Sequence, residues 1–247
     1  MEIQIIKTSK PKLKNPTLID GFPGLGLVGT VAASYLVEKL KMEPMGYIQG
    51  EQLPPLAAVH NYAPHYPARL YFSKKYNLII LMSEFIVPIA AVHGLSQAIY
   101  SFAQKEKVSR IISLGGISIK GEQDTVYMIA SSEKLRTELS KQKGIEGIKE
   151  GATTGVTGVL LARGAVENFP VISLLAEAHE EFMDPKAAAM VVEVLNRILK
   201  LNVDTSELET ESAKIHEKMQ ELLSKAKASH THYKKAEESQ SLGPMYG

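Results

Sequence analysis

Runs of apolar residues alternate with polar turns over residues 1–203. Unbroken apolar runs such as Leu78–Met82 are typical of strands buried on both faces of a sheet. Segments with helical spacing, such as Ile89–Lys107, follow these runs. The alternation predicts an α/β domain with a mostly parallel sheet that is flanked by helices. The predicted strands are Ile3–Ile6, Thr17–Ile19, Met45–Gln49, Leu56–Tyr62, Arg69–Ser73, Leu78–Ser83, Arg110–Leu114, Thr125–Ala130 and Val171–Leu175, and the predicted helices are Leu25–Lys41, Ile89–Lys107, Ser132–Lys143, Thr153–Arg163 and Pro185–Leu199.

The pattern changes after Val203, where apolar residues recur every seven positions. The spacing predicts an amphipathic oligomerising helix over residues 204–228. A lone helix with so narrow an apolar seam is marginally stable, so the seam needs a partner, either another copy of the chain or the globular body. Residues 229–247 are mostly polar and small, which predicts a flexible tail. The seam residues are Leu208, Ile215, Met219 and Leu222.

A glycine-rich loop lies between the second predicted strand and the first predicted helix. Residues 24–29 match the G-x-G-x-x-G pattern of dinucleotide-binding loops. The charge of Asp20 would repel a pyrophosphate, and Pro23 lacks an amide N–H that could bind one. We therefore interpret the loop as a tight turn with close helix–sheet packing, and we retain a nucleoside- or nucleotide-binding enzyme as the alternative. The structural glycines are Gly21, Gly24, Gly26 and Gly29.

Composition narrows the class of protein. The net charge of +1 gives no electrostatic reason to expect nucleic-acid binding. The absence of cysteine excludes disulfides and a cysteine nucleophile. No apolar stretch reaches the roughly 20 residues that span a bilayer, and the N-terminus lacks the plan of a signal peptide. A cytoplasmic protein without membrane contact is the expectation.

Candidate catalytic residues are scattered rather than grouped. Neither a His-Glu-x-x-His motif nor a Gly-x-Ser-x-Gly motif is present. Asp20 and Glu84 would form a carboxylate pair only if their strands were neighbours. We therefore expect no catalytic residue, no metal site and no cofactor.

Several segments together resemble the proteasome assembly chaperone family, in its archaeal and bacterial branch. The resemblance covers about residues 15–203 and depends on the order and spacing of the segments. It implies a fold similar to that of nucleoside phosphorylases, and a function in binding proteasome subunits rather than in catalysis. The matching segments are Gly21–Gly29, Ser113–Gly116, Thr154–Leu161, Pro170–Leu175 and Asp184–Ala188.

The last three residues resemble the hydrophobic-Tyr-X docking motif of proteasome activators and assembly factors. Met245 supplies the hydrophobic side chain, Tyr246 the ring and Gly247 the terminal carboxylate. In this mode the side chains enter a slot between outer-ring subunits of the proteasome core particle, and the carboxylate pairs with a lysine. A short anchor is weak alone, so several tails on one homo-oligomer would act together. The resemblance favours a tetramer over a pentamer, and either an assembly chaperone or a gate-opening activator.

Overall fold

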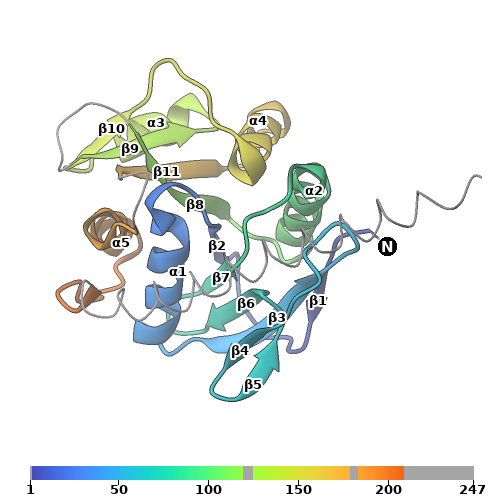
Figure 1. Cartoon of the computed structure of the whole chain (residues 1–247). Helices are drawn as coiled ribbons and strands as arrows, with labels where there is room; N and C mark the ends of the chain where they lie inside the picture. The colour runs from blue at the N-terminus through green and yellow to red at the C-terminus, as the bar shows by residue number, and fades with distance from the viewer. Residues whose placement is uncertain (1, 119–124, 179–182, 209–247) are drawn as a thin grey trace, which may run out of the picture.

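The computed structural model describes residues 2–118, 125–178 and 183–208. These residues form an α/β fold, as the apolar pattern predicts, in which helices cover both faces of one sheet (Figure 1). The strands are β1 (Gln4–Lys7), β2 (Thr17–Gly21), β3 (Glu43–Gln49), β4 (Ala58–His60), β5 (Ala63–His65), β6 (Ala68–Ser73), β7 (Leu78–Ser83), β8 (Arg110–Ile117), β9 (Val126–Ala130), β10 (Ile145–Gly147) and β11 (Val171–Glu177). The helices are η1 (Leu25–Leu27), α1 (Val28–Lys39), α2 (Ile89–Lys105), α3 (Glu133–Leu139), α4 (Gly155–Glu167) and α5 (Pro185–Leu199).

The main sheet is parallel at its centre and mostly antiparallel toward its sides, although the edge strand β10 pairs parallel with β9. Its strand order among the described residues is β1-β3-β6-β7-β2-β8-β11-β9-β10, and β4 pairs only with β5 in a separate small sheet. The central strands β7, β2, β8 and β11 are parallel. The predicted strands Arg69–Ser73 and Leu78–Ser83 are present as β6 and β7, which pair antiparallel. The carboxyl ends of the four central strands therefore meet at one edge of the sheet, where α/β proteins place their ligands.

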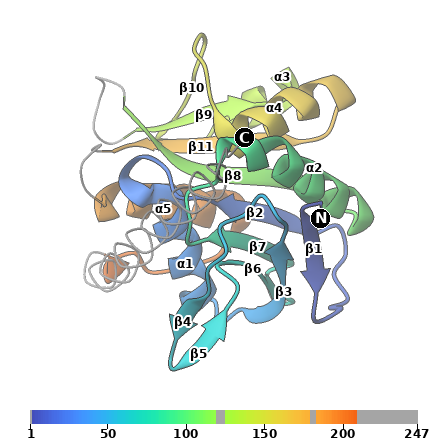
Figure 2. The same cartoon turned by 45° about the vertical axis from the view of Figure 1, so that its right-hand side comes forward.

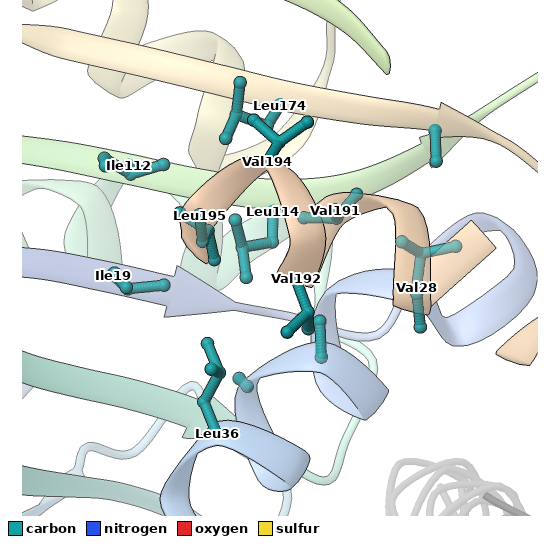
Figure 3. Packing of buried hydrophobic residues seen from close by; sticks show 14 of the residues in the cluster. Ile19, Val28, Leu36, Ile112, Leu114, Leu174, Val191, Val192, Val194 and Leu195 are labelled. Carbon is teal, nitrogen blue, oxygen red and sulfur yellow. The ribbon is translucent and has the colours of Figure 1, made fainter. Parts of the chain in front are cut away.

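Two apolar cores lie on the two faces of this sheet. Helices α1 and α5 cover one face, and α2 and α4 cover the other (Figures 1 and 2). Figure 3 shows Val191 and Leu195 of α5 packed over Leu114 of β8. The buried strand β7, whose six residues are all buried, contributes to both cores because its side chains alternate between the faces.

Some boundaries differ from those that the sequence predicts. Strand β8 continues through Gly115 and Gly116 to Ile117, because these residues pair with β11 as far as Glu177. The first helix begins at Val28, three residues later than predicted, because Gly26 and Leu27 have positive φ angles of 59° and 51°. The short strand β5 lies in a proline-rich segment and β10 in a segment rich in glycine and charged residues, and the apolar pattern reveals neither of them. None of the helices in the described ranges combines the length and the hydropathy needed to cross a membrane.

Candidate functional site

The glycine loop connects β2 to α1 at the centre of the sheet. Most of its glycines pack so closely against neighbouring atoms that a side chain would not fit. A Cβ atom on Gly21 would lie 2.2 Å from the carbonyl oxygen of Gly29. A Cβ atom on Gly29 would lie 2.3 Å from the carbonyl oxygen of Leu114. Gly26 needs its left-handed φ of 59° and packs against a neighbouring loop. Gly24 differs, because its Cβ would meet no atom within 4 Å.

The first turn of α1 is buried together with this loop. Val28 and Val31 have no exposed surface, and Gly29 between them is also buried. A dinucleotide-binding loop instead leaves the amide groups of the helix N-terminus open toward a phosphate. The geometry of the loop therefore favours helix–sheet packing over nucleotide binding.

Asp20, directly before the loop, is buried in the core on the face covered by α2 and α4. Its side chain has no exposed surface, and its Oδ2 atom accepts a hydrogen bond of 2.8 Å from the Ser113 hydroxyl of β8. Its Oδ1 atom has no hydrogen-bond partner among the described residues. Burial raises the pKa of Asp20 to about 7, while the Ser113 hydrogen bond acts in the opposite direction. The carboxyl group is therefore largely protonated below neutral pH.

Asp20 belongs to a polar row that crosses three neighbouring strands. Ser113 of β8 is the register partner of Asp20 in β2 and of Ser173 in β11. All three side chains have no exposed surface, and the Ser173 hydroxyl also lacks a partner in the described part of the chain. Neither serine is predicted as a site residue from the sequence. The sequence does contain a signal that could have pointed to them. Each serine interrupts an apolar buried strand directly after a pair of β-branched residues.

Glu84 forms a separate cluster, so the conditional pair with Asp20 does not form. Strands β2 and β7 are neighbours, but Glu84 lies beyond the end of β7 and pairs with other residues. Its carboxylate oxygens lie 2.9 Å from the Arg69 guanidinium and 2.9 Å from His60 Nε2. Arg69 also lies 3.2 Å from His60 Nε2. The two buried carboxyl groups therefore have different partners and cannot share a proton.

The described residues include no group of three or more histidine, aspartate or glutamate side chains placed to hold a metal ion. His60 and His65 face each other with ring centroids 5.9 Å apart, and the Glu84 cluster holds His60. The expected absence of a metal site stays a prediction, because His230 and His232 lie outside the described residues.

The predicted docking and oligomerisation residues are only partly described. Met245, Tyr246 and Gly247 lie outside the described residues, as do the seam residues Ile215, Met219 and Leu222. Leu208 is described, and its side chain is fully buried in the chain's own core. Residues 204–207 form no helix, and the first helical residue after them is Leu208.

Comparison with known proteins gives the family. The model of the PAC2 family matches residues 18–223. The chain belongs to the PAC2 family. The matched range contains the glycine loop and the polar row, so the resemblance inferred from these segments is confirmed.

Relatives match this chain over nearly its whole length, and two of them have solved structures. PbaA of Pyrococcus furiosus, described as an archaeal homologue of a proteasome-assembly chaperone, is 33% identical, covers 91% of this chain and 99% of its own, and has a TM-score of 0.80. PbaB of the same organism, described as an archaeal proteasome activator, is 26% identical, covers 90% and 98%, and has a TM-score of 0.76. An uncharacterised protein of Methanocaldococcus jannaschii is 31% identical over 99% of this chain and 98% of its own. The chain is thus similar over nearly its full length to a chaperone homologue and to an activator.

Proposed function

We propose that this PAC2 family member is a homo-oligomeric chaperone or activator of the proteasome core particle. The observation that carries the proposal is the similarity to PbaA, 33% identical over 91% of this chain. The similarity to PbaB, an activator, supports the same partner. The packed glycine loop supports a binding role for the chain rather than nucleotide chemistry.

The proposed anchor is the C-terminal tripeptide. Met245 and Tyr246 would enter a slot between neighbouring outer-ring subunits, and the Gly247 carboxylate would pair with a lysine there. Methionine suits an irregular apolar slot because its side chain is flexible and polarisable. Several tails on one oligomer would raise the effective concentration of the second and later contacts.

Binding of the full-length protein to purified archaeal core particle tests the proposal. We expect Tyr246→Ala, and removal of residues 245–247, to abolish binding. Tyr233→Ala is the matched control, because it removes a tyrosine from the same predicted tail outside the tripeptide. Equal binding by all variants would show that the tail is not the anchor, and failure of the intact protein to bind would overturn the proposal.

Two assays separate the chaperone from the activator. A gate-opening activator raises peptide hydrolysis by the mature core particle, and this increase should disappear with Tyr246→Ala. An assembly chaperone instead speeds the formation of rings from free subunits and leaves hydrolysis by the mature particle unchanged.

A further inference from the structure

The hairpin of β4 and β5 carries an unusual residue at its tip. His60 pairs with Ala63, so Asn61 and Tyr62 form a two-residue turn, and both have positive φ angles, 49° and 64°. Such turns favour glycine and asparagine, because bulky side chains meet steric hindrance in this region. Asn61 suits the turn, and Tyr62 does not.

The Tyr62 side chain makes no packing contribution that would offset this backbone strain. It is fully exposed, at 103% of the reference area, so its ring buries no apolar surface within its own chain. Glycine at this position would remove the backbone strain without any loss of side-chain packing. A strained, exposed aromatic residue is a candidate for a functional role.

The stretch of chain around Tyr62 lacks charged residues. Residues 53–67 contain no Asp, Glu, Lys or Arg, although these types make up 22% of the chain. Large apolar side chains are nevertheless exposed here, including Val59 at 64% and Tyr66 at 46%. The loop after β7, which begins at Glu84, adds the exposed Ile86. Exposed aromatic and aliphatic side chains without charge are typical of the centre of a protein–protein interface.

The same hairpin region contains hollows large enough to receive a tyrosine side chain. One, of about 400 Å³, is lined among others by Leu56, Tyr66 and Tyr71. Another, of about 380 Å³, is lined among others by Leu53, Tyr66 and Phe85. Tyr66 forms part of both walls, and its ring is fixed by stacking on Tyr47 at a centroid distance of 4.1 Å.

The Glu84 cluster holds the hairpin against the body of the protein. His60 lies in β4, Arg69 in β6 and Glu84 after β7, so their contacts connect the hairpin to the main sheet. Glu84 is 5% exposed, and such buried pairs are costly to break. The tip is therefore presented in one orientation, which lowers the entropic cost of binding.

We propose that this hairpin surface, residues 53–67 with residues 84–89, is an interface between two copies of this chain, with Tyr62 of each copy seated in a hollow beside Tyr66 of the other. A two-fold interface requires a surface that carries both a projecting group and its receptor, and this surface carries both. The two segments contain one charged residue, Glu84, which is buried and pairs with Arg69. Arg69 and Glu51 also line the hollows, so the surface carries few charges that would repel a second copy. Homodimer interfaces are also the most apolar class. The two segments supply about the 20 residues per partner that a standard interface uses.

The proposed interface shares with the proposed function only the expectation of a homo-oligomer. It is independent of the tail tripeptide and of the heptad seam. Removal of residues 245–247 should therefore leave the mass of the oligomer unchanged, whatever it does to proteasome binding.

Light scattering across a range of protein concentrations tests the interface. We expect Tyr62→Gly to halve the mass, or to raise the dissociation constant at least tenfold, without lowering the melting temperature. Val166→Ser is the matched control, because Val166 is 81% exposed on α4, away from the hairpin segments, and its change should leave the mass intact. An unchanged mass for Tyr62→Gly, or a monomeric wild-type protein, would overturn the proposal. Loss of core-particle binding with an unchanged mass would instead assign the surface to the proteasome, and would also overturn it.

Fluorescence provides a second, direct readout. The chain contains no tryptophan, so Tyr62→Trp places its one tryptophan at the tip, where its emission can be excited apart from that of the tyrosines. We expect its emission to shift to shorter wavelength as the oligomer forms with rising concentration, and Val166→Trp to show no shift. If the Tyr62→Trp variant keeps the emission wavelength of a solvent-exposed indole in the oligomer, the interface is contradicted.

Discussion

The Ser113 hydroxyl donates a hydrogen bond of 2.8 Å to Asp20 Oδ2 across the β2–β8 ladder, where neither residue has any exposed surface. The other carboxyl oxygen of Asp20 has no partner in the described part of the chain. Burial raises the pKa of Asp20 to about 7, so the folded protein holds a proton in its core at mildly acidic pH.

This proton makes the free energy of unfolding depend on pH. In the unfolded chain Asp20 ionises near its ordinary pKa of 3.8, whereas in the folded protein it stays protonated until about pH 7. Its contribution to stability is therefore complete below pH 3.8, falls as pH rises, and is lost above pH 7. Between about pH 5 and about pH 8 we expect a loss of about 2 to 3 kcal/mol. Urea unfolding of the wild type beside Asp20→Asn measures this loss, because the amide does not titrate.

Asp204 provides the control for this experiment. Its hydrogen bonds with Ser206, first among the causes, lower its pKa, so its contribution has the opposite sign and is lost as pH falls. The Asp204→Asn variant should therefore lose as much free energy of unfolding between about pH 5 and about pH 8 as the wild type does. If Asp20→Asn shows the same decline as the wild type, another group is responsible.

The glycines of the loop should differ sharply in their tolerance of a methyl group. Gly29→Ala places a Cβ atom 2.3 Å from a backbone carbonyl oxygen of β8, which cannot move aside. We expect a loss of about 1 to 3 kcal/mol or more from overpacking. Gly24→Ala is the matched control, since φ is −152° and no atom lies within 4 Å. Thermal melting compares the two, and similar melting temperatures would contradict the packing role of Gly29.

The apolar pattern was sufficient to predict the fold class and the central strands. An unbroken apolar run such as Leu78–Met82 fits few positions in a fold, because only a sheet covered on both faces buries every side chain of a strand. The exact start of α1 could not be predicted, since it depends on the positive φ of Leu27, a residue type that rarely adopts it. Leu208 also shows the limit of pattern reasoning. Its heptad spacing fits a seam between chains, yet the side chain lies in the core beside α1 and α5.

The site was less predictable than the fold, because it depends on contacts between distant segments. Asp20 and Ser113 are 93 residues apart, and only the register of β2 with β8 brings them together. Asp20 and Glu84, by contrast, lie near the ends of neighbouring strands, yet each finds a different partner. Spacing along the chain carries no information on either outcome.

The nucleotide-binding alternative predicts a ligand-induced rise in melting temperature. A ligand at about 100 times its dissociation constant stabilises a protein by about 2.7 kcal/mol, which is a rise of several degrees at this size. We expect no rise with a panel of nucleosides, nucleotides and dinucleotides, because the first turn of α1 is buried. A reproducible rise that Gly24→Asp removes would instead support binding at the loop.

The Glu84 cluster should respond strongly to the loss of its carboxylate. Glu84→Ala leaves the guanidinium of Arg69, whose side chain is only 12% exposed, without its counter-ion, which costs up to about 3 to 5 kcal/mol. The exposed pair of Arg136 and Glu133 is the control, because Glu133→Ala at a surface pair should cost at most about 1 kcal/mol. Denaturant midpoints give both values. Equal, small losses would mean that the buried cluster does not hold the hairpin in place.

The predicted heptad seam can be separated from the core by comparing its residues. Leu208 is fully buried within its own chain, so Leu208→Ala should lower stability by about 2 to 5 kcal/mol and leave the oligomer's mass unchanged. Ile215 and Leu222 lie outside the described residues, and the seam predicts that their joint change to Ser lowers the mass without lowering the melting temperature of the globular part. Light scattering and thermal melting of the same samples distinguish these outcomes. A seam variant that melts early but keeps its mass would mean that the helix packs on its own chain, and the oligomer would then depend on the hairpin surface alone.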